Sequence, residues 1–173
     1  MRLIFFPLFL VAIISSYAQL SRVYTSPDRS EKAVVLTSPK GESRVEIRAM
    51  PDGRVLLVRD ETSCDGSSGR PVSRAVWTPD SQFFVVGTEA SGGHQPWARP
   101  IWVYSRVRNR VFELEKMGAT PVGDFKLDPP DVIHVDVPDC GAGRGDLQPR
   151  RLVFSLHELV AAGRLPNAPC PAK

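Results

Sequence analysis

The sequence predicts an all-β, mainly antiparallel protein made of repeated β-meanders, with one short helix near the C-terminus. The phrase at residues 21–28, Ser-Arg-Val-Tyr-Thr-Ser-Pro-Asp, returns in altered form at residues 73–80, an offset of 52 residues, and a weaker echo occupies residues 126–131. Each copy leads into short runs of β-forming residues that are separated by turn formers. A recurring period of this size indicates repeated supersecondary units.

Residues 1–18 have the layout of a secretory signal peptide. Arg2 precedes an apolar stretch at residues 3–14, and Ser16-Tyr17-Ala18 supplies the small residues of a cleavage site. The apolar stretch is short for a bilayer span, which needs about 20 residues, although a retained signal anchor is the alternative. We therefore expect a periplasmic or secreted protein with no stable membrane insertion after signal removal.

Residues 19–173 are of a suitable length for a single β-rich domain. Its first unit covers about residues 21–60. Four runs of β-formers make up this unit, at residues 22–25, 33–37, 44–48 and 54–59. Pro-Lys-Gly and Pro-Asp-Gly turns separate the later runs, so the unit is predicted to be a four-stranded meander.

A polar stretch rich in Gly and Ser, residues 60–70, suits a mobile connection to the second unit at residues 72–115. This second unit has the clearest pattern in the chain. Its β-forming runs lie at residues 72–77, 82–89, 101–105 and 110–114. A long loop at residues 90–100 separates the middle two runs.

The third unit, about residues 124–154, is less regular. Its runs at residues 124–127, 132–137 and 150–154 enclose a glycine-rich loop. Helical spacing follows at residues 155–162, where Ser155 and Glu158 have the spacing of a capping box, and Gly163 opens a tail at residues 163–173. We expect this helix to cover an edge or a face of the sheet, because open edges expose unpaired backbone groups.

Residues 77–88 and the Ile-Trp-Val-Tyr run at residues 101–104 resemble the WD40-like repeat of TolB-type β-propellers. In that family an aromatic-Ser-Pro-Asp-Gly turn joins the first two strands of a blade. The resemblance covers about residues 21–137, but Arg29, Ser81 and Val132 stand where the family has glycine. It implies an interaction scaffold with a protein partner in the bacterial cell envelope.

Three blade-like units cannot close a propeller, because closed propellers usually need four to eight blades. The units are therefore expected to form an open or partial propeller or a sandwich. The alternative is a homodimer in which two chains supply six blades.

The most distinctive loop contains His94, Gln95, Trp97 and Arg99, between glycines and prolines. An aromatic side chain and a cation on a loop between rigid strands are typical of a recognition site, so these four residues are the predicted binding residues. The alternative is a long hairpin loop whose Trp97 folds back onto the sheet.

The three cysteines are Cys64, Cys140 and Cys170. In an oxidising compartment two of them are expected to pair, and the preferred pair is Cys140 with Cys170. Pairing of Cys64 with Cys140 remains open. The remaining thiol would be free or would link two chains, which gives an alternative function as a structural or assembly protein.

One group of candidate metal ligands is dense: His134, Asp136, Asp139 and Cys140. His134 and Asp136 would share a face of a strand, but the spacing of the whole group matches no zinc pattern. The sequence contains no nucleophile elbow, metalloprotease helix or phosphate-binding loop motif. We therefore predict no metal, no cofactor and no catalytic residue. The alternative is an exported hydrolase or metal-dependent enzyme that uses His94 or His134 with nearby acidic residues.

The formal net charge is only +3 and gives no strong field for nucleic acid. Arg106, Arg108 and Arg110 alternate along one hairpin, which predicts a solvated face. The sequence as a whole favours an exported, non-catalytic β-rich domain that binds a protein partner.

Overall fold

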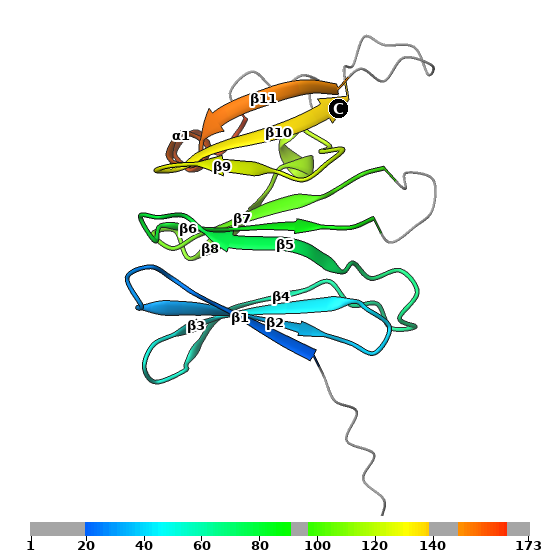
Figure 1. Ribbon diagram of the computed structural model, residues 1–173, viewed down its shortest axis with the longest axis vertical. Coiled ribbons are helices and arrows are strands. Elements are labelled where there is room, and N and C mark those ends of the chain that lie inside the picture. The colour runs from blue at the N-terminus through cyan, green and yellow to red at the C-terminus, as the bar shows by residue number, and fades with distance from the viewer. Residues whose placement is uncertain (1–19, 91–96, 139–148, 166–173) are drawn as a thin grey trace, which may run out of the picture.

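A computed structural model describes residues 20–90, 97–138 and 149–165 of the chain. The strands form three antiparallel sheets that stack as three layers (Figure 1). The helical content of the described residues is one short α-helix near the C-terminus and one turn of 3-10 helix, η1 (Glu115–Met117). The predicted fold class, an open all-β arrangement with a short C-terminal helix, is thus confirmed.

The first sheet has four strands in chain order: β1 (Leu20–Thr25), β2 (Glu31–Thr37), β3 (Ser43–Ala49) and β4 (Val55–Asp60). Alternate residues of the two central strands point toward the second sheet, which is the pattern of a strand that is buried on one face. Val35 and Val45 are cross-strand partners on this buried face. Val58, on the opposite face, is 44% exposed.

The second sheet lies in the middle of the stack and is buried on both faces. Its strands are β5 (Val72–Trp77), β6 (Phe83–Thr88), β7 (Ile101–Ser105) and β8 (Arg110–Glu113). Phe84 packs in the core against the first sheet, and Phe83 packs in the core against the third sheet. Because each such side chain stabilises the fold by about 1.5–3 kcal/mol, the central sheet holds the three layers together.

The third sheet has three strands in the order β11 (Pro149–Ser155), β10 (Val132–Pro138) and β9 (Lys126–Asp128). The helix α1 (Leu156–Ala162) begins directly after β11. Ser155 caps its first turn by accepting backbone hydrogen bonds, and Gly163 ends it with a left-handed φ of 66°. Leu156 and Leu159 place the helix against the core between the second and third sheets. Among the residues that the structure describes, no helix is long and apolar enough to cross a membrane.

The repeated phrase forms the same turn twice. In residues 26–31 and in residues 78–83, the backbone N–H of the first residue donates to the carbonyl oxygen of the last, at 2.9 Å in both. The hydroxyl of that first residue, Ser26 or Thr78, donates to the aspartate two positions later. The two copies of the phrase, 52 residues apart, therefore share their hydrogen bonds as well as their sequence pattern.

The position after each of these two aspartates has a left-handed backbone without glycine. Arg29 has a φ of 57° and Ser81 a φ of 61°. A residue with a Cβ atom pays about 1–2 kcal/mol for this conformation. Glycine adopts this conformation most readily, so both turns form the same shape with residues that carry a Cβ atom.

The tight turns lie at one end of the strands and the long loops at the other, on opposite sides of the stacked layers (Figure 1). We call the first the turn end; it comprises residues 26–30, 50–54, 78–82, 106–109 and 129–131. We call the second the loop end; its described residues are 38–42, 61–71, 89–90, 97–100 and 114–125. Because all three sheets are meanders, every second connection falls at the same end, and side-chain contacts align the ends of neighbouring layers. At the turn end, for example, the hydroxyl of Ser81 accepts from the backbone N–H of Asp28 at 3.0 Å.

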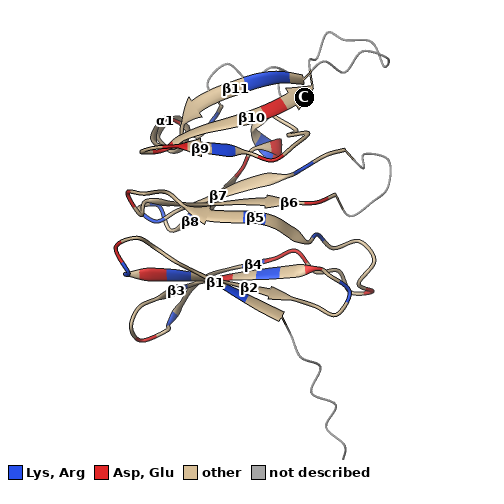
Figure 2. Ribbon diagram, viewed as in Figure 1, with Lys and Arg blue, Asp and Glu red and all other residues tan. Residues whose placement is uncertain are grey.

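Charged residues are spread over all three layers (Figure 2). Several of their side chains form ion pairs between neighbouring layers. Arg106, on the hairpin of the second sheet, pairs with Asp28 and Glu31 of the first, with its Nε 3.3 Å from Glu31 Oε1. Arg59 on β4 lies 3.0 Å from Glu113 on β8. The prediction that the arginine hairpin is only a solvated face is therefore wrong for Arg106.

Candidate functional site

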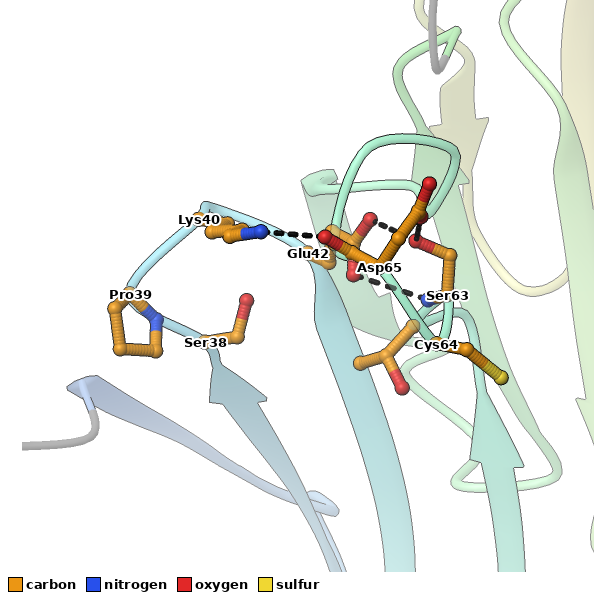
Figure 3. A pocket seen from close by; sticks show the side chains of 9 residues that line it. Ser38, Pro39, Lys40, Glu42, Ser63, Cys64 and Asp65 are labelled. Carbon is orange, nitrogen blue, oxygen red and sulfur yellow. Dashed lines mark hydrogen bonds between the residues drawn. The ribbon is translucent and has the colours of Figure 1, made fainter.

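Among the pockets formed by the described residues, two lie at the loop end, and we call them the Glu42 pocket and the Trp97 pocket. The Glu42 pocket has a volume of about 470 Å³ and lies beside the first sheet (Figure 3). Its lining residues come from the β2–β3 turn and from the connection after β4: Ser38, Pro39, Lys40, Glu42, Thr62, Ser63, Cys64, Asp65 and Gly66. The pocket thus forms where two connections of one sheet approach each other.

Glu42 holds the far wall of this pocket in place. Its carboxylate accepts the backbone N–H of Ser63 at 3.0 Å, the Ser63 hydroxyl at 2.7 Å and the backbone N–H of Gly69 at 2.6 Å. These bonds, the one from the Ser63 hydroxyl above all, lower the pKa of Glu42. A Cβ atom at residue 69 would collide with the carboxylate and with the backbone of Glu61. The predicted mobile connection at residues 60–70 is therefore a loop that a buried carboxylate anchors.

Asp65 and Lys40 close the same pocket from opposite sides. The Lys40 ammonium donates to the backbone carbonyl oxygen of Asp65 across the gap (Figure 3). The Asp65 carboxylate accepts from Ser67 and Ser63, and these bonds lower its pKa to about 2. Both carboxylates of the pocket are thus ionised at neutral pH and engaged within the protein.

Cys64 points to solvent at the edge of the pocket, and within the described part of the chain its thiol is free. A cysteine nucleophile needs a neighbouring base or cation that favours the thiolate. The residues that line this pocket include no histidine. The ammonium group of Lys40, which also lines the pocket, is hydrogen-bonded to the carbonyl oxygen of Asp65. The arrangement offers an accessible thiol without the groups that would activate it.

The Trp97 pocket lies beside the predicted recognition loop. Its volume is about 170 Å³, and it is lined by Trp97, Val122, Pro138 and Pro149. Trp97 is 46% exposed, so its ring is available to a partner. The pocket lies between the connection that precedes β7, the connection that precedes β9, the last residue of β10 and the first residue of β11.

Of the predicted binding residues, the structure describes Trp97 and Arg99, whereas His94 and Gln95 lie outside the described residues. The Arg99 backbone N–H donates to Pro121 at 2.7 Å, and its guanidinium lies 3.5 Å from Glu89. Arg99 therefore fixes the base of the loop, while Trp97 faces the pocket. The predicted disulfide partners Cys140 and Cys170 also lie outside the described residues.

His134 and Asp136 do share the outer face of β10, as the alternation predicts. His134 Nε2 lies 2.8 Å from Asp128, while Asp136 pairs with Arg151 at 2.9 Å. The other members of the predicted ligand group, Asp139 and Cys140, are outside the described residues. Within the part of the chain that the structure describes, no three ligating side chains are grouped to hold a metal ion.

One cluster at the turn end was missed in the sequence. The Asp131 carboxylate accepts from the Ser155 hydroxyl and from both the backbone N–H, at 3.0 Å, and the ring Nδ1, at 2.8 Å, of His157. Burial opposes ionisation of Asp131, but these bonds outweigh it and lower its pKa. Ser155 and His157 bind the same carboxylate oxygen and do not face each other as nucleophile and base would. The cluster anchors the start of α1.

Its sequence signal was Pro130-Asp131, the Pro-Asp pair of the weaker third echo of the repeated phrase, together with the Ser155 cap. Each was visible alone, but 24 residues separate Asp131 from Ser155, and their contact depends on the pairing of β10 with β11.

Comparison with known proteins identifies no family: no protein-family model and no curated protein matches this chain. Among solved structures, a protein of Clostridium novyi NT that is provisionally described as a conserved lipoprotein is similar with a TM-score of 0.44. Its sequence identity is 9%, and the alignment covers 78% of this chain and 86% of that one. A similarity this low supports no inference about family or function.

Proposed function

We propose that this chain is an exported, non-catalytic β-rich domain that binds a protein partner of the bacterial cell envelope through its loop end. The observation that carries the proposal is the Trp97 pocket. The tryptophans Trp77 and Trp102 are only 6% and 2% exposed, whereas Trp97 is 46% exposed beside an apolar cavity. Exposed aromatic anchors next to apolar pockets are typical of the centres of protein interfaces.

The size of the pocket favours a protein partner over a metabolite. Small-molecule sites commonly enclose about 300–1,000 Å³, and the Trp97 pocket, at about 170 Å³, is smaller. A cavity of this volume suits one apolar side chain of a partner. Arg99 follows Trp97 by two residues in the chain, and its guanidinium lies 3.5 Å from Glu89.

The architecture supports the same function. Three stacked sheets with two shared cores give a rigid support, and loops on a rigid support commonly carry binding. The signal-peptide pattern of residues 1–18 supports export. The two equivalent turns, with their left-handed Arg29 and Ser81, support descent from blades of the TolB type.

Site-specific photo-crosslinking in the host organism tests this function. A photoreactive residue in place of Trp97 is expected to give one reproducible adduct with another envelope protein. The matched control places the same residue at Val58, which is 44% exposed on the outer face of the first sheet. Adducts that are absent at residue 97, or identical at residues 97 and 58, would contradict the proposal.

A further inference from the structure

Over the residues that the structure describes, the third sheet has one strand fewer than the other two sheets. In the first and second sheets, β4 and β8 occupy the fourth position, next to β3 and β7. In the third sheet the chain enters α1 after β11, and within the described residues no strand pairs with the outer edge of β11. An edge of this kind presents a row of backbone donors and acceptors to another strand.

The side chains of β11 alternate between the core and the exposed outer face of the third sheet. Leu152 and Phe154 point into the core, while Arg151 and Val153 lie on the outer face, and Val153 is 55% exposed. The helix does not replace the missing strand, because it packs through Leu156 and Leu159 against the core. The edge is also long, since β11 extends over seven residues.

The order of residues in β11 makes the strand complementary to itself. In an antiparallel pair related by a two-fold axis at Leu152, Arg151 is opposite the partner's Val153, and Arg150 is opposite the partner's Phe154. No two cations then face each other, and each guanidinium meets an apolar or aromatic side chain. If the axis moves to Arg151, two arginines are directly opposite, which is unfavourable. The axis at Leu152 also uses the whole strand, because Pro149 is then opposite the partner's Ser155.

We propose that β11 is a dimerisation edge at which two copies of this chain join antiparallel, with the two-fold axis at Leu152. Two three-stranded sheets then become one continuous sheet of six strands. This interface is separate from the proposed binding of a protein partner through Trp97. The observations favour a second copy of this chain as the occupant of the edge, because β11 pairs with the β11 of that copy without placing two cations opposite each other.

Charge substitutions of opposite sign at Val153 test the proposal. In the dimer, Val153→Arg places a cation opposite the partner's Arg151, whereas Val153→Glu places an anion there. Each cross-strand pair changes the association free energy by about 0.2–1 kcal/mol, and the two-fold axis doubles the change. The dissociation constant, measured by sedimentation equilibrium in reductant, should thus rise about 2- to 30-fold for Val153→Arg and fall by a similar factor for Val153→Glu.

The control applies the same two substitutions at Val23, which is 58% exposed on β1 of the first sheet. Neither change there should move the dissociation constant, and circular dichroism checks that all four variants fold. A strict monomer at the highest soluble concentration would overturn the proposal, as would equal effects of Arg and Glu at residue 153. Protection of the β11 edge amides against hydrogen exchange in dilute monomer would also overturn it, because the chain itself would then cover the edge.

Discussion

Replacing Asp131 by asparagine should destabilise the protein by removing the charge that anchors the start of α1. The carboxylate accepts three hydrogen bonds, one from Ser155 and two from His157, and its residue is only 6% exposed. A hydrogen bond to a charged group contributes about 1.5–3 kcal/mol net. Asparagine keeps the shape and one acceptor oxygen but loses the charge, so we expect a loss of about 2 kcal/mol in the free energy of unfolding.

Urea unfolding followed by the fluorescence of the buried Trp77 and Trp102 measures this loss. For a chain of this size, 2 kcal/mol corresponds to a decrease of about 4–8 °C in Tm. The matched control is Asp52→Asn, in the exposed β3–β4 turn, where the carboxylate accepts the backbone N–H of Arg54 at 3.1 Å and lies 3.9 Å from the exposed guanidinium of the same residue. We expect this control to stay within about 0.5 kcal/mol of the wild type.

The pH dependence gives a second, independent check. The folded pKa of Asp131 lies below its ordinary value of 3.8. Its stabilising contribution is therefore complete above the unfolded pKa and is lost as the pH falls through the folded pKa. The stability difference between the wild type and Asp131→Asn should close as the pH decreases below about 4. An unchanged urea midpoint at neutral pH, or a difference that persists in strong acid, would refute the reasoning.

Three further substitutions test other parts of the structure. Arg29→Gly should raise the free energy of unfolding by about 0.5–1 kcal/mol, because relief of the left-handed strain exceeds the entropy cost of glycine; a lower Tm would contradict this. Gly69→Ala should destabilise by about 1–3 kcal/mol and expose the loop after β4 to proteolysis, whereas Gly123→Ala, with open space around it, should have no effect. Trp97→Phe should remove most of the tryptophan emission that acrylamide quenches, and equal quenching before and after the change would show that Trp97 is not the exposed ring.

The strands were predictable because their signals are local. Alternating β-formers between Pro, Gly and Asp turns placed the strand runs, and the Ser155 cap with Gly163 placed the helix. The same local signals were insufficient where a residue serves a distant partner. Glu42 had no special spacing in the sequence, yet it anchors the loop after β4 through Ser63 and Gly69, more than 20 residues away. The hairpin pattern likewise predicts a solvated Arg106, because its partners Asp28 and Glu31 belong to another sheet.

The repeated turns and the unrepeated loops lie at different ends of the strands, and this separation bears on function. At the turn end, the repeated phrase forms the turns at residues 26–31 and 78–83, and its hydrogen bonds recur from the first sheet to the second. The loop end is built from segments without counterparts in the repeat, and both pockets are there. A repeated turn is constrained by its structural role in each layer, whereas a loop on a rigid support can vary without loss of the fold. The third sheet follows the same pattern, since the repeat weakens at residues 126–131 and the sheet that follows has no fourth strand within the described part of the chain. The places where the repeat fails, Trp97 at the loop end and the edge of β11, are thus the places where contact with other molecules is expected.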